Sequence, residues 1–179
     1  MDIFTHALLP VILVGAIAKR PDLRGRWQLV SIGIAGALPD ILCPHLSLEA
    51  RMASWSHGIP CWFMLTIVML MISYFSRRRI AAGFVSLLSG AYFLHMMCDA
   101  ISGGVNFFYP FGNGSWGDYW VDPIWWIPLD IACFLTVYFM FRVAPRMRAL
   151  KQSGQTSLQG GLLESATDSN ATGRDSNER

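Results

Sequence analysis

Long apolar runs, separated by short clusters of basic residues, most constrain what this chain can fold into. Hydrophobic residues make up 53% of its 179 residues and charged residues only 15%, whereas a soluble domain carries about 25% charged residues. A membrane-spanning helix needs about 20 mostly apolar residues. The runs therefore predict an all-α integral membrane protein, a polytopic transmembrane helical bundle. The net charge of +2 is too small to favour nucleic-acid binding.

Five apolar segments can be distinguished: Ile3–Ala18, Gln28–Cys43, Ile59–Phe75, Ile80–Ile101 and Ile124–Val143. The first two are short for a full span, so we expect about four to five membrane helices. The leading pair forms either thin spans or a helical hairpin packed against the other three. The first run has no basic region before it and no small-residue cleavage site after it, so it is not expected to be a signal peptide.

The composition changes near the C-terminal end. Residues 1–148 contain all the apolar segments and are expected to form one transmembrane helical domain. Ser, Gly, Gln, Thr and Asn dominate the end of the chain, which predicts a disordered cytoplasmic tail over residues 149–179. The four cysteines lie in or beside apolar runs and form no Cys-x-x-Cys pair, as is typical of small buried residues.

Basic residues gather at alternate ends of the apolar segments, and this pattern predicts the orientation. They follow the first, third and fifth segments: Lys19, Arg20, Arg24, Arg26, Arg77, Arg78, Arg79, Arg142, Arg146, Arg148 and Lys151. The connection between the second and third segments contains only Arg51, and the next outer connection contains no basic residue. The N-terminus is therefore expected outside and the C-terminus in the cytoplasm. Dense aromatic residues between positions 107 and 126 suit an outer membrane–water interface.

A few ionisable residues interrupt the apolar segments, where they are costly and therefore candidates for function. They are His6, Asp40, His57, His95, Asp99 and Asp130. In the predicted orientation, the first five lie at the outer ends of four different segments. Since the orientation was inferred from lysines and arginines alone, this convergence supports it independently.

The convergent residues have the chemistry of a metal site. His95 and Asp99 are one helical turn apart and share a face, so that they bind one ion or Asp99 orients the imidazole. Three histidines and two carboxylates suit a divalent ion, with zinc favoured. The expected metal ligands are His6, Asp40, His57, His95 and Asp99, and Asp40 or Asp99 is the expected catalytic base.

Each of these residues also has a purely structural interpretation. A histidine in a membrane bundle is often a hydrogen-bonded packing residue, Asp40 after a proline can end a helix, and Ser56 can cap one. His45 follows Pro44 and has no partner at helical spacing, so it is left out of the set. Asp118 and Asp122 are candidate accessory ligands, and Asp130 is expected to pair or to face a cavity.

The sequence resembles the LexA-regulated, membrane-bound metal-dependent hydrolases of bacteria over about residues 1–145. The resemblance rests on Thr5-His6, Leu38-Pro39-Asp40, Ser56-His57-Gly58, the run from Leu94 to Ala100, and Tyr109-Pro110-Phe111. It implies a bacterial inner-membrane location. The family commonly has a second acid two residues after the first, where this chain has Leu42, and it often has His-Arg ahead of the Thr-His-Ser element. The resemblance therefore favours one metal ion over two.

The order of these residues is also similar to that in helical zinc phospholipase C enzymes. Those enzymes have further histidines downstream, whereas this chain has none after His95. That similarity points only to phosphoester chemistry in general.

Two functions follow from these patterns. The first is a metal-dependent hydrolase at the outer face of the membrane, acting on a lipid or lipid-linked substrate through a metal-activated water. The second is a non-enzymatic membrane protein, either a metal or proton carrier or an envelope-stress scaffold. The expected partner in both cases is the lipid bilayer, with no nucleic acid. The sequence does not predict an oligomeric state.

Overall fold

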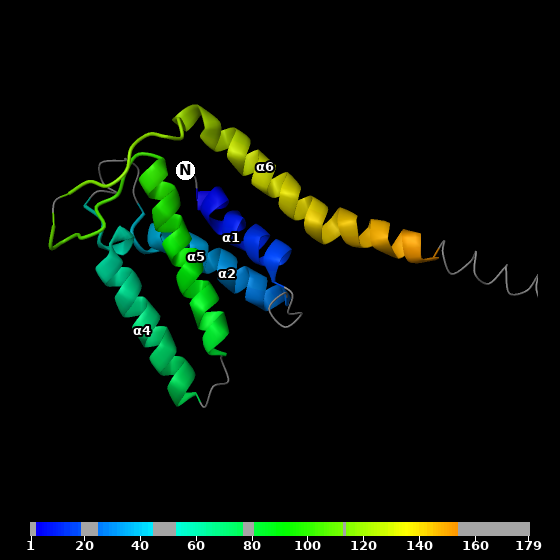
Figure 1. Cartoon of the computed structure of the whole chain (residues 1–179), viewed down its shortest axis with the longest axis horizontal. Coiled ribbons are helices and arrows are strands. Elements are labelled where there is room, and N and C mark those ends of the chain that lie inside the picture. Colours follow the sequence, from blue (N-terminus) through cyan, green and yellow to red (C-terminus); the bar gives the residue numbers. More distant parts are fainter. Residues whose placement is uncertain (1–2, 19–24, 45–52, 77–80, 113, 154–179) are drawn as a thin grey trace, which may run out of the picture. The chain divides into compact units, whose positions relative to one another are not determined.

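The computed structural model describes residues 3–18, 25–44, 53–76, 81–112 and 114–153. Regular structure in these residues is helical, and the principal elements are α1 (Ile3–Ile17), α2 (Arg26–Leu42), α4 (Ile59–Phe75), α5 (Ala82–Ile101) and α6 (Trp126–Tyr138). Short 3-10 turns, η2 (Trp55–His57) and η3 (Pro123–Trp125), precede α4 and α6. The described residues contain no β-strand, so the predicted all-α class is confirmed (Figure 1).

The helices begin and end close to the predicted segments, with one clear difference at the C-terminal end. Beyond α6 the helix passes through a π-helical turn, Phe139–Val143, and continues to Ser153. The π-turn lies just ahead of Pro145, which has no N–H to donate to the preceding turn. Residues 149–153 of the predicted tail are thus helical, and residues 154–179 lie outside the described residues.

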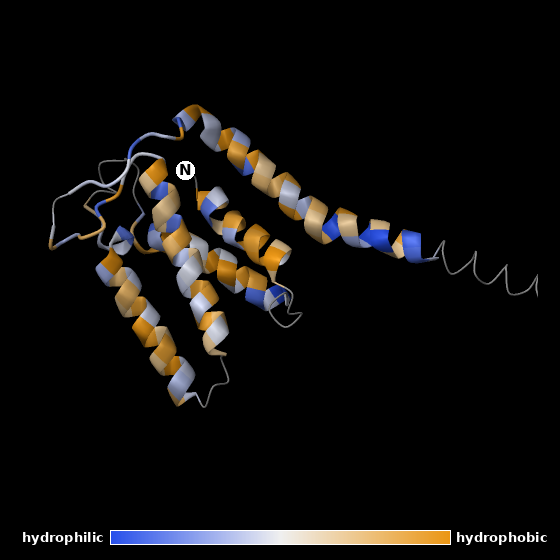
Figure 2. Ribbon diagram, viewed as in Figure 1, coloured by the Kyte–Doolittle hydropathy of each residue, from blue (hydrophilic) through white to orange (hydrophobic). Residues whose placement is uncertain are grey.

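Within the described residues, two helices are long and apolar enough to cross a membrane: Ala82–Ile101 and the continuous helix Pro123–Ser153. Helices α1 and α4 are apolar but have 15 and 17 residues, below and at the lower limit for a full span. Of the four to five membrane helices predicted, two therefore meet the criterion of length and composition. Figure 2 shows apolar residues along most of α1 and α4, and polar residues gathered where the helix that starts at α6 ends.

The chain divides into two compact units, residues 1–137 and 138–179. Within the first unit, α5 packs against α1, α2 and α4 (Figure 1). One buried cluster joins α1, α2 and α5, and a second joins α4 and α5: Val11, Ile32, Ala35, Leu88 and Ala91, then Cys61, Tyr92 and Met96. Because α5 contacts three other helices, its side chains reach the centre of this unit. Three of the four cysteines are buried and none forms a disulfide.

The outer surface of α4 is apolar. Phe63, Met64, Val68 and Met71 are each about half exposed. A contiguous apolar surface of this kind is unusual on a soluble monomer, and it suits contact with lipid or with another membrane helix.

The described residues 102–112 and 114–122 form a segment that is held against the end of α5. The Asp118 and Val121 N–H groups donate to the carbonyls of Ala100 and Ile101, and two isolated β-bridges close the segment on itself. Gly117 adopts φ +99°, and a Cβ there would lie 1.8 Å from the Ala100 oxygen. Only glycine satisfies both conditions, so the segment is anchored at a defined position next to the helix that carries His95 and Asp99.

Candidate metal centre

Four side chains from three elements meet at one end of the first unit. Asp40 comes from the last turn of α2, His57 from η2, and His95 and Asp99 from the last two turns of α5. Each offers a ligand atom, and these atoms all lie within 4.8 Å of one another. We refer to these four residues as the histidine–aspartate cluster. His57, His95 and Asp99 are fully buried, whereas Asp40 retains 18% of its side-chain exposure.

The Asp99 carboxylate lies at the centre of the cluster. Its Oδ2 atom is 3.1 Å from His95 Nε2 and 3.3 Å from His57 Nε2. Asp40 Oδ1 approaches the same two nitrogens, at 3.6 Å from His95 and 3.3 Å from His57. Two imidazole nitrogens and two carboxylates therefore surround a common point.

The hydrogen bond on the far side of His95 determines which of its nitrogens faces this point. Its Nδ1 lies 2.7 Å from the carbonyl oxygen of Gly36. A carbonyl can only accept, so Nδ1 carries the proton and the neutral ring presents the lone pair of Nε2 to the carboxylates. Metal-binding histidines are commonly oriented by such a bond to a backbone carbonyl.

The same reasoning applies to His57, through a serine pair. Ser56 Oγ donates to the Pro39 carbonyl at 2.8 Å, which uses its only proton. It therefore accepts from His57 Nδ1, 3.1 Å away, and Ser54 Oγ lies at the same distance from that nitrogen. His57 Nε2 is thus also a lone-pair donor in the neutral ring, and it lies 3.2 Å from His95 Nε2.

The centre of the cluster favours positive charge. Two lone-pair nitrogens and two carboxylates repel one another at these distances unless a cation lies between them. Burial alone lowers the pKa of His57, but the carboxylates of Asp40 and Asp99 outweigh burial and raise it overall. The residues present therefore fit a divalent metal ion, which would take the place of a proton on His57 Nε2. Imidazole nitrogens with carboxylate oxygens are a ligand set that zinc accepts.

His6 lies beside the cluster and contacts it through Asp99. Its Nε2 is 3.1 Å from Asp99 Oδ1, whereas the contacts of Asp99 with His57 and His95 are made by Oδ2. Its ring stacks on that of His95 with centroids 3.9 Å apart. His6 Nδ1 is buried without a hydrogen-bond partner among the described residues. The structure thus brings all five sequence-predicted residues together, with four around one point and His6 adjoining them. Metal ligation by each remains a prediction.

The remaining candidates lie elsewhere. Asp118 is exposed, and its Oδ1 accepts from the Tyr119 N–H. Asp122 accepts from the Ile124 N–H and caps η3. Neither belongs to the cluster. His45 lies outside the described residues. The N-cap residue of α4 is Gly58, with no side-chain capping bond, and Ser56 instead contacts His57, so the capping alternative for Ser56 is wrong.

Sequence reasoning did not identify two residues of the site. Gly36 supplies the carbonyl that orients His95, and a Cβ there would lie 2.3 Å from the His6 carbonyl oxygen. The absence of a side chain therefore allows α1 and α2 to approach closely where both contribute to the site. Ser54 contacts His57 from three residues away. A glycine one turn before Pro39-Asp40 and a Ser-x-Ser-His run are local signals that could have identified them.

Asp130 ties α6 to the start of α1. Its Oδ1 accepts from the Thr5 backbone N–H at 2.9 Å and also from the Thr5 hydroxyl. The Thr5 N–H is one of the first donors of α1, which have no partner inside their own helix. A buried carboxylate at that helix end is favourable because the helix dipole is positive there. Asp130, expected to pair or to face a cavity, thus holds the turn that carries His6.

This contact leads to a stability prediction. Replacing Asp130 with alanine leaves the buried Thr5 donors without an acceptor, which costs about 1–3 kcal/mol. The thermal unfolding midpoint of the protein in detergent should fall, whereas Asp118→Ala, in an exposed turn, should change it little. Equal midpoints for the two variants would show that the Asp130 contact does not stabilise the fold.

Comparison with known proteins supports the membrane assignment. Residues 1–158 match the model of the YdjM inner membrane protein family. No curated protein and no solved structure matches the chain. The matched region includes the five principal helices and every residue of the histidine–aspartate cluster. Since the match covers most of the sequence, the chain belongs to the YdjM inner membrane protein family.

Proposed function

We propose that this protein is a membrane-bound metal-dependent hydrolase. One observation carries the proposal: two buried imidazoles, each held by a bond to its Nδ1, direct their Nε2 atoms at two carboxylates. A histidine that serves only in packing needs hydrogen-bond partners for its ring nitrogens. Here the Nε2 lone pairs instead face carboxylate oxygens, and both groups are acceptors. Such a cluster at the accessible end of a helical unit is suited to hold a catalytic ion.

The four residues of the cluster have different roles in this proposal. His57, His95 and Asp99 are buried and would hold the ion. Asp40 is the one member with partial exposure, so substrate and water approach from its side. Its carboxylate would accept the proton from the attacking water. When bound, a divalent ion, for which we favour zinc, supplies Lewis acidity that polarises the scissile group and lowers the pKa of water to about 7.

His6 acts through Asp99 in this proposal. It contacts Oδ1, while Oδ2 faces the other two histidines. An imidazole in contact with the second oxygen of a ligating carboxylate would fix the orientation and the basicity of that carboxylate. This assignment differs from the sequence-based set, in which His6 is a direct ligand.

The substrate class follows from the location of the site. The positive-inside pattern predicts that the cluster lies at the outer face of the inner membrane. The anchored segment beside it exposes Phe111, Trp116 and Trp120, which are residues suited to the lipid headgroup region. A lipid or a lipid-linked phosphoester is therefore the substrate we propose.

Metal analysis and activity measurements test the proposal together. Purified wild-type protein should contain about one divalent ion per chain and should hydrolyse a member of a panel of phospholipids and lipid-linked phosphates. Chelation should abolish turnover, and the added ion should restore it. Transport of the ion into proteoliposomes without any hydrolysis would replace the hydrolase with the carrier function.

The role of His6 is tested separately, by metal titration. His95→Ala removes a ligand and should abolish stoichiometric binding. His6→Ala removes only a group that orients Asp99, so metal affinity should fall by about 10–100-fold with stoichiometry retained. Complete loss of the ion in His6→Ala would show that His6 is itself a ligand.

A further inference from the structure

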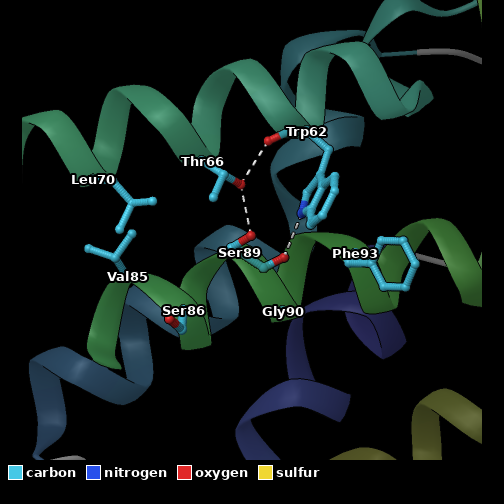
Figure 3. A pocket seen from close by; sticks show the side chains of 8 residues that line it. All are labelled: Trp62, Thr66, Leu70, Val85, Ser86, Ser89, Gly90 and Phe93. Carbon is cyan, nitrogen blue, oxygen red and sulfur yellow. Dashed lines mark hydrogen bonds between the residues drawn. The ribbon is translucent and has the colours of Figure 1, made fainter. Parts of the chain in front are cut away.

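A groove between α4 and α5 lies outside the metal centre. It encloses about 290 Å³ (Figure 3). Its walls include Trp62, Thr66 and Leu70 from α4 and Val85, Ser89 and Phe93 from α5. In Figure 3, Thr66 faces Ser89 and Leu70 faces Val85 across the gap between the helices. None of these residues belongs to the histidine–aspartate cluster.

The polar atoms of the groove wall are already paired with one another. Thr66 Oγ1 donates to the Trp62 carbonyl at 2.8 Å and accepts from Ser89 Oγ, also at 2.8 Å. The Trp62 indole N–H donates to the Ser89 carbonyl at 3.0 Å, and Ser86 Oγ donates to the Ala82 carbonyl. Every hydroxyl and indole donor of the wall is thus used within the helix pair, so the groove has no donor left for a polar ligand.

The position and size of the groove indicate which kind of ligand it binds. α5 is one of the two helices that meet the membrane-span criterion, and the α4 surface beside the groove exposes Phe63, Ile67 and Met71. The groove therefore opens toward hydrocarbon. Its volume is at the lower end of the range for small-molecule sites, and its lining offers mostly apolar contact. We propose that it binds one acyl chain of a membrane lipid.

A helix from a second copy fits this surface less well. Close approach of two membrane helices is favoured by a face of small residues. Gly83, Ser86 and Gly90 begin such a face on α5, but Phe93 follows one turn later and contacts Trp62 with ring centroids 5.3 Å apart. These two rings stand at the end of the groove. A flexible chain one methylene wide can lie beside them, whereas a helix of about 10 Å diameter is held away.

Two glycines of α5 provide a matched pair of substitutions. A Cβ at either Gly90 or Gly83 would meet no atom within 4 Å, and both residues are exposed on the same helix. Leucine is a better helix former than glycine, so neither change should disturb α5. Only Gly90 lines the groove. Gly90→Leu therefore fills the groove, while Gly83→Leu adds the same side chain outside it.

The experiment uses the full chain in nanodiscs of phosphatidylethanolamine and phosphatidylglycerol, with a phosphatidylcholine that carries a diazirine in its acyl chain. After illumination, lipid adducts are mapped by peptide mass spectrometry. Wild type and Gly83→Leu should give adducts on residues 62–70 and 85–93. Gly90→Leu should reduce these about tenfold, because the leucine excludes several methylenes from the wall. Gly90→Ala should give an intermediate decrease, which provides a second, milder variant.

Two outcomes would overturn the proposal. Adduct levels at the groove that do not change in Gly90→Leu would mean that the lipid contacts the helices without entering it. Peptide-to-peptide crosslinks across the groove between copies, introduced with a cysteine crosslinker at Ser86→Cys, would assign it to a second copy. Neither readout uses the metal or hydrolysis, so this inference and the proposed function can fail separately.

Discussion

Asparagine in place of Asp99 is expected to abolish stoichiometric metal binding and, with it, any hydrolysis. Asp99 contacts His6, His57 and His95 at 3.1 to 3.3 Å, more of the site than any other carboxylate of the described residues. Asparagine has nearly the same shape but lacks the negative charge that would offset a divalent cation in a buried site. Metal content per chain, measured after purification with added ion, is the direct readout.

The matched control is Asp118→Asn. Asp118 is exposed, and its oxygen accepts from a neighbouring backbone N–H, a bond that the asparagine oxygen can also make. Metal content should therefore equal that of wild type. Both variants should elute as wild type in detergent, since the substitution preserves side-chain volume. An Asp99→Asn protein that retains one ion per chain would rule out Asp99 as the central ligand.

Alanine in place of Gly36 should have the second large effect, on stability and on the metal site together. The new Cβ would lie 2.3 Å from the His6 carbonyl oxygen and 2.8 Å from Pro10 Cγ. Neither the backbone oxygen nor the proline ring can rotate away, so α1 has to move as a whole. Overpacking of this kind costs about 1–3 kcal/mol or more. The thermal midpoint should fall, and metal affinity should fall because both His6 and the Gly36 carbonyl shift.

Gly83→Ala is the control for this prediction. The added methyl would meet nothing within 4 Å, and alanine is favoured over glycine inside a helix by about 1 kcal/mol. Its midpoint should equal or exceed that of wild type. If Gly36→Ala has the thermal midpoint and the metal affinity of wild type, the close approach of α1 to α2 at Gly36 is not a requirement of the site.

Some features of the fold could be predicted because they depend on neighbours in the sequence. Hydropathy is such a property, and helices α1 and α4 begin and end within one residue of the predicted segments. The spacing of His95 and Asp99 places both on one face of α5 whatever surrounds that helix. The convergence of His6, Asp40, His57, His95 and Asp99 followed from the alternation of helix directions between basic clusters.

Other features depend on contacts between distant residues. The Gly36 carbonyl and His95 are 59 positions apart, and Thr5 and Asp130 are 125 apart. No periodic pattern connects such pairs, so their hydrogen bonds could not be predicted. The number of spans does not follow from the apolar runs for a related reason. An apolar run shows that a helix avoids water, but both lipid and a protein interior satisfy that requirement.

The sequence alone thus determined that the chain is a helical membrane protein with its rare polar residues at one end. Hydropathy and helical periodicity are local, and they suffice for that conclusion. The tertiary structure decided how the five residues are arranged: Asp99 at the centre, Asp40 at the partly exposed edge, and His6 on the second oxygen of Asp99. It also revealed the paired hydroxyls of the α4–α5 groove. These distinctions depend on which atoms meet across helices, which packing decides and sequence spacing does not.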